Sequence, residues 1–269
     1  MDKNTIEILI RQANSGDKRS LEEVVLHIKD YVYNLSLKML LFPEDAKDAT
    51  QEILIKVITH LSTFNFQSKF STWVYRIATN YLLTQKAKKS KEFAMSFSEY
   101  ASMIDSGQSD IVNYTSNAGE LKLLEEEVKV SCTQGLLLCL NPMDRMVYIF
   151  AEILEFNSKE GANILEITAE NFRKKLSRSR LKIRIFLTQK CGLVNSANPC
   201  RCAKKIDFLI NEKTINPQQL RFANLNQRSL DLMQKIDEAE KSIAIYRSVP
   251  EVEAPPVIFE NIKSILSNV

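Results

Sequence analysis

The sequence has few residues that break helices and few that cross-link chains. Its 269 residues include six glycines and seven prolines, so turns are few and long helices are expected. The five cysteines are an odd number, and the polar N-terminus has no signal-peptide pattern, so a disulfide framework is disfavoured. No apolar run approaches the ~18 residues that a membrane span needs. These absences predict a cytoplasmic protein.

The sequence also lacks the patterns of an enzyme. It has no G-x-x-x-x-G-K-[ST] phosphate-binding loop and no convergent set of nucleophile, base and metal ligands. Charged residues make up 26% and the net charge is only +3, so the distribution of charge is more informative than its sum. We therefore expect a protein without catalytic activity and without a required cofactor.

The hydrophobic periodicity divides the chain into four parts. Residues 1–84 show consecutive helical patterns, 85–120 are polar and weakly patterned, and 121–187 are helical again. Residues 188–269 open with a Cys-containing turn and then show helical stretches at 204–211, 217–246 and 258–266. We predict an all-α fold: two small helical domains, a flexible linker between them, and a helical C-terminal extension.

Three carboxylates lie on one face of a helix predicted to begin at Pro43. Pro43 suits the first helical position, and Asp45, Asp48 and Glu52 then follow at i, i+3 and i+7. Lys56 comes four residues after Glu52, a favourable spacing for an ion pair. Such a face is either a solvated surface or a docking surface for a basic partner, and the pattern alone leaves both interpretations open.

The stretch "FNFQSKFSTWVYRIATNYLL" combines aromatic rings with cations and amides and contains no acid. Its first part reads as a loop, and Ser71 or Thr72 is a suitable cap for a helix that begins at Trp73. Aromatic rings beside cations can stack the bases and hold the phosphates of single-stranded DNA. Packing in the core is the alternative role for each ring.

A basic helix-turn-helix pattern covers 158–187. A short helix at 159–165, a tight turn near Glu166, and a longer helix from Ala169 form the motif. One face of the longer helix carries Phe172, Leu176, Ser179 and Ile183, while its outer face is strongly basic after Glu170. Such a helix enters the major groove of duplex DNA, and the alternative is a solvated basic helix.

Together, these three segments resemble a bacterial RNA polymerase sigma factor of the extracytoplasmic-function (ECF) type. "DAKDATQEILIKV" is similar to the D-x-x-D-x-x-Q-E-x-[FL] helix of that family. "FSTWVYRIATNYLL" is similar to its F-x-T-W-L-x-R-I-A-x-N segment, and "ILEITAENFRKKLSRSR" to its L-G-[IL]-S-x-x-T-V-[KR]-x-R-L-x-R-A-R recognition helix. The resemblance covers roughly residues 15–187.

The resemblance implies domains and partners. Residues 1–84 would be sigma domain 2, 121–187 sigma domain 4, and 188–269 an extension of unknown role. The partners would be core RNA polymerase, through its β′ clamp, and promoter DNA, as a single strand at −10 and as duplex at −35. An anti-sigma factor is a further partner that the sequence neither requires nor excludes.

The resemblance also assigns a role to three groups of residues. The group expected to bind the polymerase is Asp45, Asp48, Gln51, Glu52 and Lys56. The group expected to contact the −10 strand is Phe66, Gln67, Ser68, Lys69, Phe70, Arg76 and Asn80. The group expected to contact the −35 duplex is Glu170, Asn171, Arg173, Lys174, Lys175 and Arg178.

Some positions depart from the family pattern. Gly161 replaces an aliphatic residue in the first helix of the helix-turn-helix, and Glu166 replaces the usual glycine of the turn. Asn171-Phe172 replaces Thr-Val. These departures predict an altered turn, and the preferred −35 sequence cannot be read from the helix.

A stand-alone helix-turn-helix regulator is the alternative function, with 1–83 as a dimerisation or ligand domain.

The extension begins with three cysteines in a C-x8-C-x-C pattern, Cys191, Cys200 and Cys202. Structural zinc takes four ligands, and the two histidines, His27 and His60, belong to another domain. A turn with ordinary reduced thiols, a metal site and a redox switch all remain open. The helices that follow would regulate the factor in cis, contact a partner, or stabilise the fold.

Overall fold

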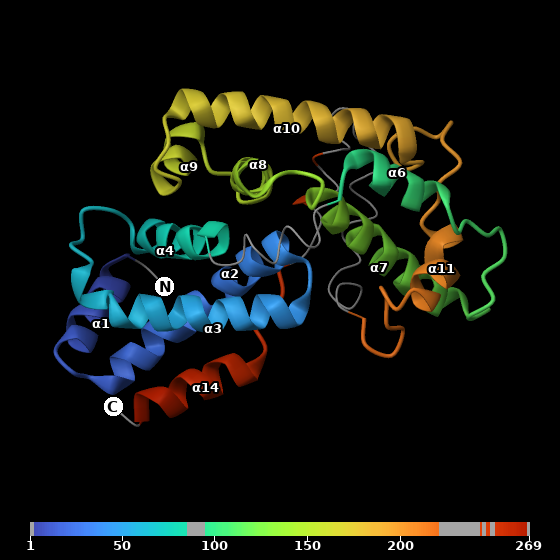
Figure 1. Cartoon of the computed structure of the whole chain (residues 1–269). Helices are drawn as coiled ribbons and strands as arrows, with labels where there is room; N and C mark the ends of the chain where they lie inside the picture. The colour runs from blue at the N-terminus through green and yellow to red at the C-terminus, as the bar shows by residue number, and fades with distance from the viewer. Residues whose placement is uncertain (1–2, 85–94, 221–242, 244–245, 248–250, 268–269) are drawn as a thin grey trace. The chain divides into compact units, whose positions relative to one another are not determined.

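The computed structural model describes residues 3–84, 95–220, 243, 246–247 and 251–267, and within these ranges every regular element is a helix (Figure 1). The all-α prediction is therefore confirmed. None of the described helices is both long and apolar enough to cross a membrane. The chain forms two compact units: unit 1 is Met1–Glu92, Ser158–Ala169 and Glu251–Val269, and unit 2 is Phe93–Asn157 and Glu170–Pro250.

Unit 1 is a helical cluster in which α2 and α3 make the most extensive contact. Its helices are α1 (Lys3–Asn14), α2 (Lys18–Leu40), α3 (Pro43–Thr59), the short η1 (Leu61–Thr63), α4 (Phe70–Thr84), α9 (Ser158–Ile164) and α14 (Pro256–Ser267). The apolar stripes of α2, α3 and α4 supply the core through Val25, Ile28, Ile53 and Val74, all fully buried. The segment 158–169 and the C-terminal helix thus share a unit with the N-terminal domain.

Local sequence explains where the helices of unit 1 begin and end. Asp17 caps α2 by accepting hydrogen bonds from the backbone N–H groups of Arg19 and Ser20. Gly16, just before it, has a φ of +96°, a value that glycine adopts without strain. Pro43 occupies the start of α3, where its missing N–H has no helical partner to lose.

Unit 2 contains two long helices, α7 and α10. Its helices are α6 (Phe97–Asp105), α7 (Ala118–Leu137), α8 (Pro142–Tyr148), the π-helical turn η2 (Ile149–Ile153), α10 (Ala169–Lys190), η3 (Ala203–Lys205) and α11 (Ile206–Asn211). Arg145 is 1% exposed. Its guanidinium donates to the carbonyls of Leu137, Leu138 and Leu140 at 2.9, 3.2 and 3.1 Å, which satisfies the C-terminal end of α7.

The segment predicted as a flexible linker, 85–120, contains a helix. α6 begins with a capping box in which the Ser96 hydroxyl and the Glu99 carboxylate each bond the backbone of the other residue. Tyr100 of this helix is buried and donates to the carbonyl of Cys132 on α7 at 2.6 Å. Residues 95–120 therefore pack onto unit 2. Contacts with residues distant in the sequence stabilise this segment, and its weak hydrophobic pattern did not indicate them.

The extension divides between the two units. Ile206 and Leu209 of α11, with Ile215, form a buried cluster with Leu124 and Val128 of α7. α14, predicted at 258–266 and observed at Pro256–Ser267, belongs to unit 1. The helix predicted over 217–246 lies almost wholly outside the described residues, and residues 217–220 are not helical.

Candidate polymerase and DNA interfaces

The predicted acidic face of α3 is present and accessible. Asp48, Glu52 and Lys56 are exposed, and Asp45 and Gln51 are partly exposed. The opposite side of the same helix is fully buried through Ala46, Ala49, Ile53 and Val57. The amphipathic pattern therefore fixes which side of α3 faces outward.

The acidic face adjoins α4. Burial raises the pKa of the Tyr81 hydroxyl, and the carboxylates of Glu52 and Asp48 raise it further. Both carboxylates therefore lie close enough to Tyr81 for their charge to act on it. The face is an anionic surface that runs along α3 beside α4 and is suited to a basic partner.

The rings of the aromatic loop do not all play the same part. Phe64 and Phe70 are 4% and 6% exposed, and their centroids lie 5.3 Å apart. Trp73 stacks on Phe70 at 5.8 Å, so these rings anchor the loop to the domain. Phe66 is only partly buried, while Gln67 and Lys69 are exposed. The part of the loop that could receive a base is therefore 66–69.

Phe66 is held by a residue that the motif did not indicate. The Arg11 guanidinium of α1 lies 4.2 Å from the centroid of the Phe66 ring, in cation–π geometry. The Phe66 ring also contacts that of Phe64, with centroids 4.8 Å apart. Phe66 also has a φ of 61°, which is uncommon for a residue with a side chain. Arg11 lies 55 positions earlier in the sequence than Phe66, and no spacing rule connects the two.

Of the two remaining −10 candidates, Asn80 is exposed and Arg76 is engaged within unit 1. The Arg76 guanidinium donates to the backbone carbonyl of Asn163 at 3.2 Å and to its side-chain oxygen at 3.1 Å. It also lies 3.6 Å from the Glu166 carboxylate. Arg76 would have to exchange these partners for a phosphate if it contacts DNA.

The two helices of the predicted helix-turn-helix form at the predicted positions, with α9 at Ser158–Ile164 and α10 at Ala169–Lys190. In the turn between them, Glu166 has a φ of 54°. This is the left-handed conformation that glycine adopts most easily. Glu166 therefore adopts the left-handed conformation that the family's usual glycine would adopt without strain. The Glu166 side chain makes this conformation strained.

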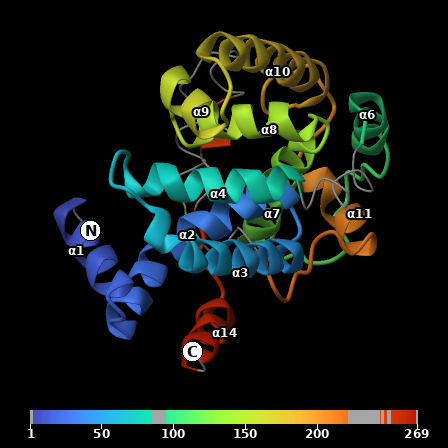
Figure 2. The ribbon, with the colours of Figure 1, turned by 60° about the vertical axis from the view of Figure 1, so that its left-hand side comes forward.

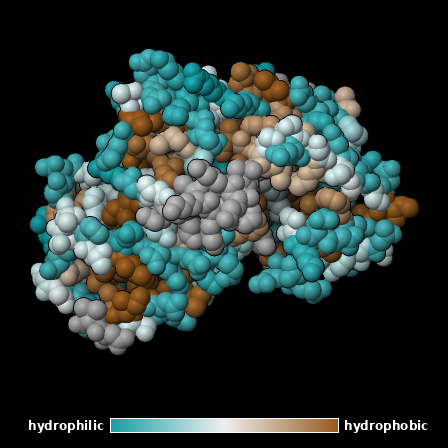
Figure 3. All heavy atoms as spheres, in the orientation of Figure 1, coloured by the Kyte–Doolittle hydropathy of each residue, from teal (hydrophilic) through white to brown (hydrophobic). Residues whose placement is uncertain are grey.

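α10 presents a basic outer surface over a buried apolar stripe. The predicted stripe, Phe172, Leu176, Ser179 and Ile183, is buried. The exposed residues include Glu170, Asn171, Arg173, Lys174 and Arg178. Figure 3 shows that hydrophilic residues cover most of the N-terminal half of α10 in that view.

Two basic residues of α10 are held by acids of unit 2 instead. Lys175 lies 3.0 Å from the Asp144 carboxylate of α8, and Lys175 is only partly exposed. The Arg180 Nε donates at 2.7 Å to the carboxylate of Glu152, whose side chain is fully buried. These pairs fix α10 on unit 2. Sequence spacing did not indicate either acid.

Comparison with known proteins decides the family. Residues 24–92 match the family described as sigma-70 region 2. The ECF RNA polymerase sigma factor SigW of Bacillus subtilis (strain 168) is 29% identical over 179 residues, which is 65% of this chain and 92% of SigW. This chain is a sigma factor of the ECF type. SigM of the same organism is 24% identical over 61% of this chain and 93% of SigM.

Membership of this family confirms the predicted function in general terms. The sigma factor directs RNA polymerase to promoters, and the stand-alone regulator is not favoured. A solved structure of CnrH in complex with the cytosolic domain of CnrY aligns with 68% of this chain and 97% of that chain, with a TM-score of 0.46 and 20% identity.

The cysteines of this sigma factor are free thiols that are partly or largely buried. Burial raises the pKa of Cys191 and of Cys200, and raises that of Cys202 well above its ordinary value. In the described part of the chain, no three His, Cys, Asp or Glu side chains are arranged to hold a metal ion. A raised pKa favours the protonated thiol over the nucleophilic thiolate.

Proposed function

We propose that this sigma factor docks on the β′ clamp of core RNA polymerase through the acidic face of α3. The proposal rests on the exposure of Asp48, Glu52 and Lys56 above a fully buried apolar side, which supports a surface role rather than a packing role. Asp45 and Gln51 flank this face and complete the predicted group. Charge complementarity would speed the encounter and fix the register of docking.

In the same proposal, the loop 66–70 captures the unpaired −10 strand. Phe66 offers a ring for stacking, while Gln67, Ser68 and Lys69 offer polar and charged contacts to a flipped base and its phosphates. Phe70 is buried and supports the loop from beneath. We add Arg11 to the group because its guanidinium lies over Phe66. Arg76 and Asn80 would contact the strand along α4.

The −35 duplex would be read by the N-terminal part of α10. Glu170, Asn171, Arg173, Lys174 and Arg178 are exposed there. The base-edge contacts would come from the first turn and the phosphate contacts from the basic residues that follow. Lys175 pairs with Asp144, so we assign it to holding α10 in place.

This function needs no catalytic group of its own. The polymerase makes RNA, and melting of the −10 element draws on the binding free energy of the captured strand. Sigma domain 2 would comprise 1–84 and sigma domain 4 would comprise 121–187. The affinity for promoter DNA should fall steeply with salt, because phosphate contacts release counterions.

The polymerase contact is tested by reversing its charge. The double variant Asp48→Arg, Glu52→Arg should lose binding to core polymerase and retain the helical circular dichroism of the parent. The matched control is Glu212→Arg, Glu260→Arg, which reverses two exposed acids elsewhere in the chain and should bind like the parent. Equal binding by both double variants would contradict the assignment of the α3 face.

A further inference from the structure

Unit 1 has a pocket where α1 turns into α2. It is lined by Arg11 and Gln12 in the last turn of α1, by Ser15 in the turn that follows, and by Asp17, the N-cap of α2. The pocket has a volume of about 400 Å³, and sites for small ligands range over ~300–1,000 Å³. All four side chains are exposed and polar. A ligand in the pocket would therefore have hydrogen-bonding groups within reach.

The pocket adjoins the loop that is proposed to capture the −10 strand. Figures 1 and 2 show α1 on the side of unit 1 where α3 ends and α4 begins, and α1 contacts η1 in that connection. Arg11 belongs to both places, because its side chain lines the pocket and its guanidinium lies 4.2 Å from the centroid of the Phe66 ring. A strand held at Phe66 can therefore reach the pocket with a neighbouring nucleotide.

The side chains of the pocket keep hydrogen-bonding capacity for a ligand. Among the described residues, the Arg11 guanidinium has no acid or carbonyl partner, and its contact is the Phe66 ring. The Gln12 Oε1 lies 3.0 Å from the Ser20 hydroxyl, and the amide N–H groups of Gln12 have no partner within the same residues. In this part of the chain, Asp17 Oδ1 accepts only from a backbone N–H, at 3.3 Å, and so keeps a lone pair.

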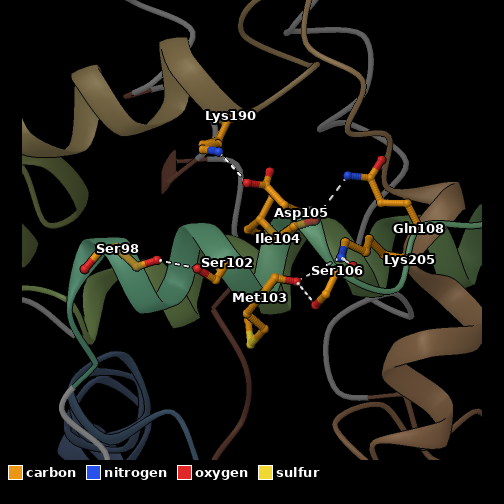
Figure 4. A network of polar contacts seen from close by, with 9 residues as sticks. All are labelled: Ser98, Ser102, Met103, Ile104, Asp105, Ser106, Gln108, Lys190 and Lys205. Atoms are coloured by element: carbon orange, nitrogen blue, oxygen red, sulfur yellow. Dashed lines mark hydrogen bonds and ion pairs between the residues drawn. The ribbon is translucent and has the colours of Figure 1, made fainter.

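The polar groups at the end of α6 in unit 2 offer no comparable site, because they bond one another (Figure 4). The Lys205 ammonium donates to the carbonyls of Met103, at 3.0 Å, and Ser106. The Lys190 ammonium lies 2.5 Å from the Asp105 carboxylate. A ligand there would have to break these contacts, whereas a ligand in the pocket of unit 1 would displace only solvent from the Arg11 and Gln12 donors.

The charges of the pocket favour a nucleobase over a phosphate. The described lining has one cation, Arg11, and one anion, Asp17, and the carboxylate of Asp17 would repel a phosphate. A guanidinium is planar and stacks on aromatic rings. Because the Phe66 ring lies on one side of the Arg11 guanidinium, a base can stack on the other side. The edge of that base would then meet Gln12 and Asp17.

The Asp17 carboxylate adds a preference among bases. An ionised carboxylate accepts hydrogen bonds and has none to donate. Adenine, cytosine and guanine each carry an exocyclic amino group that donates, whereas thymine has carbonyl oxygens instead. The free lone pair of Asp17 can therefore bond an amino group and would repel a carbonyl oxygen in the same place. The pocket should prefer a base with an amino group to thymine.

We propose that this pocket is a second base-binding site of the sigma factor, which holds an unpaired base with an amino group from the nucleotide beside the one held at Phe66. The proposal rests on the proposed capture of the −10 strand by the loop 66–70. Arg11 is the stacking residue that the two sites share, and Gln12 and Asp17 contact the edge of the second base. Strand capture thus extends from the loop to the end of α1.

The test measures how the full-length factor, bound to core polymerase, binds forks with a single-stranded −10 extension. The forks carry a promoter identified by transcription in vitro, and each nucleotide of the extension is made abasic in turn. We expect the parent to lose affinity at two neighbouring positions. Phe66→Ala should remove the sensitivity at the first position. Arg11→Ala should remove it at the second, and should bind the intact fork about 5-fold to 150-fold more weakly, which is the effect of one stacked base.

Two further variants separate base binding from a general effect of charge. Arg19→Ala removes the same charge as Arg11→Ala from an exposed side chain in the first turn of α2 that does not line the pocket, and it should keep both sensitive positions. Asp17→Asn keeps an N-cap, because Asn and Asp cap helices equally well, and it removes the carboxylate. The parent should bind a fork with thymine at the second position several-fold more weakly than forks with the other three bases. Asp17→Asn should lose most of this preference.

Three results would overturn the second site. The first is a parent that is sensitive at a single position, the one that Phe66→Ala removes, in which case strand capture stands and the second site alone fails. The second is an Arg11→Ala variant that keeps the second sensitive position. The third is its loss in Arg19→Ala as well. An unchanged preference in Asp17→Asn would overturn the role of the carboxylate. A parent that is insensitive at every position would refute strand capture itself.

Discussion

Phe66 and Lys69 offer the sharpest test of strand capture, because they lie at the exposed end of a loop whose other rings are buried. We predict that Phe66→Ala, Lys69→Ala binds core polymerase normally and forms open complexes poorly. One stacked base is worth about 1–3 kcal/mol, so loss of the ring alone should weaken capture between about 5-fold and 150-fold. Loss of one phosphate contact at Lys69 should also reduce the salt slope of binding by about 1.

The same substitution should cost little stability. Phe66 is only partly buried and contacts Phe64 with centroids 4.8 Å apart, and an aromatic pair contributes about 0.5–1.5 kcal/mol beyond its burial. Phe64→Ala is the contrasting change, because Phe64 is 4% exposed and truncation of a buried Phe costs about 3–5 kcal/mol. Phe64→Ala should therefore lower the free energy of unfolding of the domain by several times more than Phe66→Ala.

Two DNA probes separate capture from other steps. The first is a fork with a −10 single-stranded extension, and the second is a duplex that carries only the −35 element. The Phe66, Lys69 double variant, bound to polymerase, should lose affinity for the fork and retain it for the duplex. Binding of the fork within twofold of the parent would refute the role of this loop, and equal losses on both probes would show a general defect.

Three further predictions follow from individual contacts. Glu166→Gly should raise the melting temperature, because glycine relieves strain of about 1 kcal/mol at a φ of 54°, and the ion pair it removes is exposed and worth less; a lower melting temperature would contradict this. Arg178→Ala should weaken −35 binding and reduce its salt slope by about 1, whereas Arg180→Ala should chiefly lower stability because it leaves the carboxylate of Glu152 buried and unpaired. Burial lowers the pKa of Lys38 to about 8, so above that pH the unfolded chain holds a proton that the folded chain has lost, and the free energy of unfolding should rise between about pH 8 and 10. Lys38→Met should flatten this rise, and parallel pH profiles would refute it.

Much of the fold could be predicted, because local hydrophobic periodicity and capping residues determine where its helices lie and which faces they bury. α3 begins at Pro43 as predicted, and α10 buries the predicted stripe that includes Phe172 and Ile183. One boundary was wrong: α4 begins at Phe70 rather than at Trp73. Phe70 is buried against Phe64, so packing extends the helix by one turn beyond its apparent caps.

The parts that could not be predicted depend on contacts between residues far apart in the sequence. Arg11 over Phe66 joins α1 to the aromatic loop, and Glu152 on the turn after α8 fixes Arg180. The order of α6 likewise comes from Lys205 and other residues of the extension. The sequence shows each of these residues, but it does not show which of them contact one another.

The measurement that tests the central claim most directly is transcription in vitro on fragmented genomic DNA, with sequencing of the RNA 5′ ends. Core polymerase with the full-length factor should produce start sites that are absent without it and that share paired upstream motifs. The claim would be contradicted if the full-length factor produced no new starts and, without polymerase, bound duplex DNA as a symmetric dimer.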